Sequence, residues 1–379
     1  MKTNLKASSI VFYVLQTALI LSTILYLPSV YAQNELKILV WDQAYLPLEQ
    51  RKKFEDFIAR KYDYKVKIVP KIIKGPDHVF HAIRRGEVDL AAPTHNLIND
   101  PRFSLIKNQL ILPIDVKKIR NFDAVIEVFR HYFRHQDGNY YGIPFIFGPY
   151  GLIYNTQRVS ATPKHWEILW DPEYKNNYAV SHEHYEANAY ITALSLGYRE
   201  KDLSDFEKLS KDPEFVNRLA SLAVNAGAFW KTDNAESMLG KPISMSWGFA
   251  LPLLNSKEKS WEFAFVEEGT TAWMDPYVIS HTLRNKPMLR KVAEEWVNYS
   301  LSKDYQTNAV VRKLNSFPVN SNIKSLLTKE EVAQFHLDEP DFVKDHLILW
   351  PVLSIRARNG FKELWNHSLK NTQGIPIVK

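Results

Sequence analysis

A tryptophan and an aspartate stand two positions apart in the apolar stretch 266–279, which reads VEEGTTAWMDPYVI. These residues are Trp273 and Asp275, and on an extended chain this spacing points both side chains to one face. Because an indole face and a carboxylate both attract positive charge, the pair favours binding of an organic cation. The structural alternative is that Trp273 packs in a core and Asp275 begins a turn beside Pro276.

Two glutamates form a second acidic pair, at the expected start of a helix. Glu183 and Glu186 are three residues apart, so a helical chain carries both on one face, where they could meet a second cationic group. Acidic residues in the first turn of a helix also interact favourably with the helix dipole, by about 0.3–1 kcal/mol, without any ligand. The residues alone leave both interpretations open.

Alternating strand and helix patterns place further polar and aromatic residues at the ends of buried strands. The first elements expected are strand 36–42, helix 50–60, strand 64–70, helix 77–85 and strand 88–92. This βαβ order predicts a parallel sheet, whose ligands gather at the carboxyl ends of its strands. Trp41 and Asp42 end the first strand, and Thr94 follows the third. Trp247 ends a later predicted strand, although a core position is the usual role of such an aromatic residue.

A glycine-punctuated apolar run, 140–155, divides the sequence into two parts. Gly142, Gly148 and Gly151 within it indicate a bend or a close approach of the backbone, and we interpret the run as the first passage between two lobes. Beyond it, Ser181 is the predicted N-cap of a helix. The other elements expected after the run are helix and turn 163–174, strand 178–180, helices 205–209 and 213–226, strand 243–247, and helices 287–301, 329–334 and 352–369.

Length and composition also indicate two lobes. A chain of 379 residues is too long for one ordinary core, and a hydrophobic content of 45% excludes general disorder. Residues 1–32 have the pattern of a signal peptide, with Lys2 and Lys6 before an apolar run and cleavage expected after Ala32. An uncleaved membrane anchor is the alternative. The chain has no cysteine, which excludes disulfides and a lipid-modified cysteine.

Other function classes have weaker support in the sequence. The net charge of +6 is diffuse and no run of five basic residues occurs, so we expect no nucleic-acid partner. No Gly-x-Ser-x-Gly elbow and no Gly-x-x-x-x-Gly-Lys loop is present, so we expect neither an enzyme nor a cofactor. Histidine pairs keep zinc binding as an alternative: His78 with His81, His131 with His135, and His182 with His184. Clustered tyrosines keep ferric ion as another: Tyr140, Tyr141, Tyr150 and Tyr154.

Four segments together resemble a known family. They are ILVWD at 38–42, GIPFIFG at 142–148, WDPEYK at 170–175 and EGTTAWMD at 268–275. In this order the chain is similar to the periplasmic polyamine (spermidine/putrescine)-binding proteins of ABC transporters, which are bacterial extracellular solute-binding proteins. The resemblance implies an α/β, two-lobed periplasmic-binding-protein fold with a mixed or parallel sheet and flanking helices in each lobe, and a ligand cleft at the hinge. We expect residues 33–148 and 276–320 in the N-terminal lobe and residues 149–275 and 321–379 in the C-terminal lobe.

The resemblance also implies which residues bind the ligand. The family's aromatic, hydroxyl and carboxylate contacts fall on Trp41, Tyr45, Thr94, Trp247, Trp273 and Asp275. The family's acid pair falls on Glu183 and Glu186, and Asp42 at the end of the first strand completes the predicted ligand-binding set. The chain departs from the family's pattern at Asn96, Ser316 and Pro351.

The function implied is capture of a small solute. We expect a monomeric, non-enzymatic protein of the periplasm that binds an amine-bearing solute, such as spermidine or putrescine, and passes it to an inner-membrane ABC permease. The alternatives are a binding protein for another small solute, such as ferric ion or another organic compound, and a periplasmic metal-dependent hydrolase.

Overall fold

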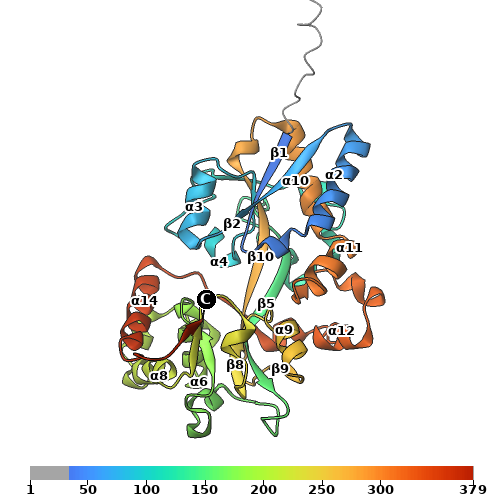
Figure 1. Cartoon of the computed structure of the whole chain (residues 1–379). Helices are drawn as coiled ribbons and strands as arrows, with labels where there is room; N and C mark the ends of the chain where they lie inside the picture. Colours follow the sequence, from blue (N-terminus) through green and yellow to red (C-terminus); the bar gives the residue numbers. More distant parts are fainter. Residues whose placement is uncertain (1–33, 379) are drawn as a thin grey trace, which may run out of the picture.

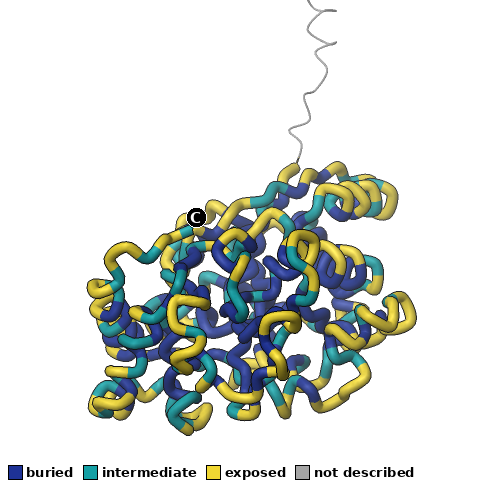
Figure 2. The backbone as a smooth tube through the Cα atoms, turned by 60° about the horizontal axis from the view of Figure 1, so that its bottom comes forward, coloured by how far each residue is buried: buried dark blue, intermediate teal, exposed yellow. Residues whose placement is uncertain are grey.

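The computed structural model describes residues 34–378, and the predicted signal peptide lies outside the described residues. The chain forms two lobes, one above the other in Figure 1. Each lobe has its own hydrophobic core, the first drawn from residues 36–147 and 273–342 and the second from residues 150–266 and 350–365. In Figure 2 the buried segments run through the middle of the molecule, with exposed residues on the outer turns.

The first lobe opens with the predicted βαβ units. Strand β1 (Asn34–Val40) pairs in parallel with β2 (Val66–Ile72) on one side and β3 (Leu90–Ala91) on the other. Helix α2 (Leu48–Tyr62) connects β1 to β2 and buries Phe54 and Ile58, which are one helical turn apart. Helix α3 (Pro76–Arg84) connects β2 to β3 and has a proline in its first turn. The carboxyl ends of β1 and β3 therefore meet at one edge of the sheet.

Two long antiparallel strands run through both lobes. They are β5 (Ile143–Asn155) and β10 (Thr270–Ser280), and every residue of both is buried. In the first lobe β10 pairs with β3 and β4 (Ile111–Leu112), and β5 pairs with β11 (Phe317–Pro318). In the second lobe β5 pairs with β8 (Ile243–Ser246) and β9 (Trp261–Ala264), and β10 pairs with β12 (Leu347–Leu349). Figure 1 shows β10 descending from the upper lobe to the lower one.

The second lobe adds a small parallel sheet and a group of packed helices. The sheet has the order β13 (Ile377–Val378), β7 (Ala228–Trp230) and β6 (Ala179–Ser181). Helix α14 (Ile355–Leu369) packs on α6 (Tyr185–Ser195), α7 (Phe206–Ser210) and α8 (Pro213–Val224). Gly360 of α14 lies directly on the Phe206 ring, where a Cβ atom would not fit. Helix α14 is thereby fixed close to α7.

The remaining helices cover the sheets or follow strand ends. They are α4 (His95–Ile98), α5 (Glu127–Arg130), α9 (Leu251–Lys257), α10 (Pro287–Ser300), α11 (Lys303–Tyr305), α12 (Lys329–Gln334) and α13 (Phe342–His346), with a π-helical turn over Gln306–Val311. Within residues 34–378, no helix is both long and apolar enough to cross a membrane.

The glycines of the run 140–155 allow the close approach that was one of their two interpretations: aromatic rings lie where side chains of Gly148 and Gly151 would be, and strand β5 continues past both. Two other elements differ from the sequence expectations. Helix α6 begins at Tyr185, and the Ser181 hydroxyl accepts the N–H of His184 outside the helix, so Ser181 is not its N-cap. The segment 163–174 forms two 3₁₀ turns, Trp166–Trp170 and Pro172–Tyr174, and no α-helix.

One segment packs differently from the expected lobe boundaries. Phe335 and Phe342 lie in the first core, although the expected division assigns residues 321–379 to the second lobe. Phe342 stacks on Phe317, whose strand β11 belongs to the first lobe. Residues 335–342 therefore pack with the first core, and Trp350 is the next buried residue of the second core along the chain.

Candidate functional site

Asp275 lies at an irregularity in the pairing of β10 with β5. It opposes Ile146, whereas the next residue, Pro276, opposes Pro144, so Phe145 on β5 is the extra residue of a β-bulge. Pro276 has no N–H to donate to the ladder, which suits it to this position. A bulge changes the direction of the side chains beside it, and the Asp275 side chain is 1% exposed.

The carboxyl group of Asp275 is only partly satisfied. Its Oδ2 accepts a hydrogen bond of 2.9 Å from the hydroxyl of Tyr45, and its Oδ1 has no hydrogen-bond partner among the residues that the structure describes. Burial raises the pKa of Asp275 to about 8, against smaller lowering contributions from the hydroxyls of Tyr45 and Thr94. Thr94 is close enough to influence the pKa, yet its hydroxyl does not meet hydrogen-bond geometry with Oδ1. A buried acceptor without a donor is the feature expected of a site for a cationic group.

The residues at the strand ends hold Tyr45 in place. Asp42 is exposed, and its carboxylate accepts the N–H of Ala44 at 2.7 Å, which caps the 3₁₀ turn Gln43–Tyr45. The Tyr45 carbonyl accepts the hydroxyl of Tyr305, so both ends of this residue are fixed. The contacts of Asp42 indicate that it shapes the turn that carries Tyr45. Thr94 follows β3 and is the residue immediately before α4.

Three tryptophans pack together at the candidate site, and a fourth, Trp41, follows the carboxyl end of β1. Trp247 packs against both cores, with its ring centroid 6.5 Å from that of Trp273 and 5.4 Å from that of Trp350. The indole nitrogens of Trp41, Trp273 and Trp350 are buried and have no acceptor within the described part of the chain. The structure thus brings the predicted Trp247 and Trp273 together and adds Trp350, which sequence reasoning missed.

The two predicted glutamates have other partners. Glu183 is exposed and forms an ion pair of 3.3 Å with Lys231. Glu186 is buried and forms an ion pair with the guanidinium of Arg358 on α14. Burial raises the pKa of Glu186, and the positive charge of Arg358 opposes this shift. Neither glutamate shares a hydrogen bond or ion pair with Asp275 in residues 34–378.

Arg358 also reaches the first lobe. Its Nη2 lies 3.1 Å from Oδ2 of Asp100, which follows α4, and Arg102 binds the same carboxylate at 2.9 Å. Arg358 and Asp100 are 4% and 0% exposed in their side chains. The result is a buried ion network between the lobes, whose members are Glu186, Arg358, Asp100 and Arg102. No sequence signal identifies it, because its members come from distant segments.

His95 makes a second bridge between the lobes. Its Nε2 lies 2.9 Å from the carbonyl oxygen of Trp350, and its Nδ1 accepts the N–H of Met274 at 3.3 Å. These partners require the proton on Nε2. Complete burial lowers the pKa of His95 to about 4, so the ring is neutral at physiological pH. His95 follows Thr94 in the sequence, and its position after a predicted strand was the only sequence feature that could have identified it as part of the site.

The residues behind the alternative functions do not gather. Tyr140 lies in the first core and bonds His131 at 2.6 Å, whereas Tyr150 and Tyr154 lie in the second core. Within the described residues, no group of three histidine, aspartate or glutamate side chains is arranged to hold a metal ion. Of the departures from the family pattern, Asn96 and Ser316 are buried and Pro351 is half-buried.

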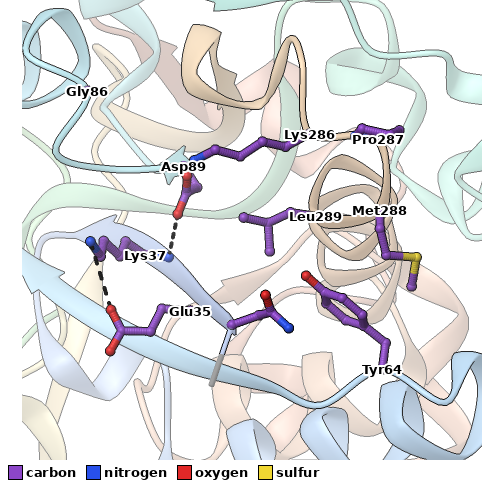
Figure 3. Close-up of a pocket in the computed structure, with 10 residues that line it drawn as sticks. Glu35, Lys37, Tyr64, Gly86, Asp89, Lys286, Pro287, Met288 and Leu289 are labelled. Atoms are coloured by element: carbon purple, nitrogen blue, oxygen red, sulfur yellow. Dashed lines mark hydrogen bonds and ion pairs between the residues drawn. The ribbon is translucent and has the colours of Figure 1, made fainter. Parts of the chain in front are cut away.

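A cavity of about 520 Å³ lies at the other end of the first-lobe sheet. Figure 3 shows Glu35 and Lys37 of β1 beside Asp89, with Tyr64 and Met288 on the far side. The Asp89 carboxylate accepts the N–H of Lys37 at 3.0 Å. This cavity is at the amino end of β1, whereas Trp41 and Tyr45 follow its carboxyl end, so it is separate from the candidate site.

Comparison with known proteins identifies the family. The family described as bacterial extracellular solute-binding protein matches residues 88–346. The spermidine/putrescine-binding periplasmic protein of Salmonella typhimurium is 26% identical over 252 residues, which cover 64% of this chain and 69% of that protein. These matches confirm the resemblance to periplasmic polyamine-binding proteins.

Solved structures show the same fold. The spermidine/putrescine ABC transporter substrate-binding protein PotD of Streptococcus pneumoniae superposes with a TM-score of 0.70 at 22% identity, covering 90% of this chain and all of that one. The binding protein AgtB of A. tumefaciens R10, in complex with agropinic acid, superposes with a TM-score of 0.59 at 14% identity, with the same coverage. The predicted two-lobed α/β fold is confirmed, and these relatives are solute-binding transport proteins. The chain belongs to the bacterial extracellular solute-binding proteins and has the fold of the substrate-binding component of an ABC transporter.

Proposed function

We propose that this chain captures a small amine-bearing solute in the periplasm and delivers it to an inner-membrane ABC permease. The observation that carries the proposal is the buried carboxyl group of Asp275, whose Oδ1 has no partner within residues 34–378. Polyamines such as spermidine and putrescine are the first candidates, because the Salmonella relative is named for them. The ion network around Arg358 concerns a further property, the number of ammonium groups that one bound solute can carry.

The chemistry of the site suits an ammonium group. An ammonium ion would donate to Oδ1 of Asp275, and charge-assisted hydrogen bonds of this kind contribute about 1.5–3 kcal/mol. The neighbouring indoles of Trp273 and Trp247 offer ring faces, and a desolvated cation–π contact adds about 0.5–2 kcal/mol. The proposed ligand-binding set is therefore Trp41, Tyr45, Thr94, Trp247, Trp273 and Asp275.

The site lies where the two lobes meet, which supports a hinge. Trp273 and Asp275 are on β10, one of the strands that pass from lobe to lobe, whereas Tyr45 belongs to the first lobe. Trp247 contacts both cores. We propose that the lobes divide near residues 148 and 275 and close on the solute as a monomer, with β5 and β10 as the hinge.

Replacing Asp275 by asparagine tests the proposed function. Asp275→Asn keeps the size of the side chain and removes the negative charge, so we expect every amine to bind at least about tenfold more weakly in calorimetric titrations. The matched control is Asp89→Asn, because Asp89 is also a buried aspartate of the first lobe but lies at the opposite end of the sheet. Amine binding should be unchanged in this control.

A thermal-shift screen over amines, amino acids and metal ions widens the test. Tight ligands raise the melting temperature by mass action, so amines should raise it in the parent protein and in Asp89→Asn. Unchanged amine binding by Asp275→Asn would make Asp275 a structural residue. Melting shifts with metal ions alone would place the protein among metal-binding relatives and contradict the proposal.

A further inference from the structure

Glu186 stands at the position where the family resemblance expects an acid for a second amine, yet the chain supplies its own cation there. The Arg358 guanidinium forms an ion pair with Glu186, and both residues are buried. Arg358 comes from α14, which packs directly on the helix α6 that carries Glu186. The pairing is thus built into the packing of the second lobe.

The nearby acid of the first lobe is occupied as well. The Oδ2 atom of Asp100 forms ion pairs with Nη2 of Arg358 at 3.1 Å and with Nη2 of Arg102 at 2.9 Å. Arg102 also pairs with the exposed carboxylate of Asp77 at 3.0 Å. Glu186, Asp100 and Arg358 are the buried members, and Arg102, whose side chain is 22% exposed, adds the second guanidinium, so the charges of these four residues balance. The Nε of Arg358 has no partner among the described residues.

We propose that Arg358 restricts the site to solutes with a single ammonium group, held at Asp275, and a neutral or negatively charged far end. The inference rests on the proposed amine-binding function and narrows its ligand class from amines in general to monoamines, so it argues against the polyamines for which the Salmonella relative is named. A second ammonium near Glu186 would lie beside a buried guanidinium, and like charges repel strongly where water does not screen them. Displacing Arg358 would break a buried ion pair and leave an arginine without its main partner.

Three four-carbon amines test the inference in the unmodified protein. Butylamine has one ammonium, putrescine has two, and 4-aminobutanoate has one ammonium and one carboxylate. In calorimetric titrations at low salt, we expect putrescine to bind no more tightly than butylamine, and 4-aminobutanoate to bind at least as tightly as butylamine. The carboxylate would face Arg358, whose Nε is free to donate.

Variants then test the role of Arg358 itself. In Arg358→Gln the Glu186 carboxylate is released, so putrescine should gain about tenfold or more relative to butylamine. In the double variant Glu186→Gln/Arg358→Gln both charges are absent, and this gain should disappear. Arg356→Gln is the matched control on the same helix, because Arg356 is exposed and pairs only with Glu207 at 2.7 Å within the described chain. The order of its affinities for the three amines should equal that of the parent protein.

The outcomes separate the inference from the function on which it rests. If the parent binds putrescine tenfold more tightly than butylamine, Arg358 does not exclude a second ammonium and the inference is wrong. An unchanged ranking in a folded Arg358→Gln variant also contradicts it. If no amine of the thermal-shift screen binds, these three included, the proposed function itself fails. Should Arg358→Gln not fold, the ranking in the parent still decides.

Discussion

Asp275 is a buried carboxyl group whose ionisation would depend on the proposed ligand. Burial raises its pKa to about 8, so without a cation the group is mostly protonated at neutral pH. Tyr45 donates to one oxygen and its own pKa is raised well above the usual value, first by burial and then by Asp275. Tyr45 therefore remains a hydrogen-bond donor at every physiological pH. An arriving ammonium would be the charge that ionises the carboxyl group.

The amine affinity should therefore increase with pH. Below pH 8 the proton on Asp275 must leave before the ammonium can pair with the carboxylate, so affinity is lost as pH falls and gained as pH rises. We expect about a tenfold increase per pH unit between pH 6 and pH 8, then a plateau while the amine stays protonated. Calorimetry in buffers of different ionisation enthalpy should show nearly one proton released per amine at pH 7.

Asp275→Asn provides the comparison for this pH dependence. It has no group to titrate in this range, so its weaker amine binding should be flat between pH 6 and pH 8. A flat profile in the parent would mean that Asp275 is already ionised without ligand, or does not meet the amine.

At the scale of elements, β5 and β10 position the site by their irregularities. The bulge at Phe145 and the proline after Asp275 turn the carboxyl group away from regular pairing, while Gly148 leaves room for the Trp273 indole. A Cβ atom on Gly148 would lie 3.0 Å from Cζ2 of Trp273, closer than an unstrained contact. The glycine at this place is explained by the indole opposite it.

Gly148→Ala should therefore displace Trp273. We expect a loss of about 1–3 kcal/mol in the free energy of unfolding, from overpacking, together with weaker amine binding. Gly151→Ala is the matched control on the same strand, because the atoms nearest to a Cβ atom there belong to the Phe263 ring of β9, 3.0 Å away, and to Pro149, and none belongs to an indole. Chemical denaturation should show a similar loss in both variants, whereas calorimetry should show weaker amine binding only in Gly148→Ala. Equal amine binding in the two variants would contradict this role of Gly148.

The regular elements were predictable because their patterns are local. Apolar spacing identified α2 and α3, and the expected ranges 287–301 and 329–334 coincide closely with α10 and α12. For strand β5 the sequence left a bend and a close approach both open, because the facing rings of Trp273 and Phe263 come from distant segments. The first turn of α6 was misplaced because Ser181 bonds its side chain to the His184 N–H outside the helix.

The site was predictable only where its parts lie close together or at strand ends. Trp273 and Asp275 are neighbours on one strand, and Trp41 follows another, so their positions could be inferred. The Glu186–Arg358 pair joins residues 172 positions apart, which no local pattern records. The acidic residue was therefore recognised, and the cation that neutralises it was not. Trp350 and His95 were missed for the same reason: they come from different lobes and lie together only because the lobes are in contact.

At the scale of the whole molecule, the lobes are in contact around the site. His95 of the first lobe meets the carbonyl of Trp350 in the second, and Asp100 of the first meets Arg358 of the second. Asp275 is 1% exposed and Trp273 5% exposed, so a solute can reach them only if the lobes separate. Strands β5 and β10 span both lobes, as Figure 1 shows, and they limit that separation to a hinge-like opening.

Solution scattering tests this opening. Opening breaks the His95–Trp350 and Arg358–Asp100 bridges, but Arg358 keeps Glu186 within the second lobe, so we expect the unliganded protein to populate an open form. An amine that pairs with Asp275 adds contacts available only when the lobes are closed, and it should therefore lower the radius of gyration at saturation. Asp275→Asn, measured at the same amine concentration, should keep the larger radius. An identical radius for the parent with and without a bound amine would show that the lobes stay closed and that the solute enters by another route.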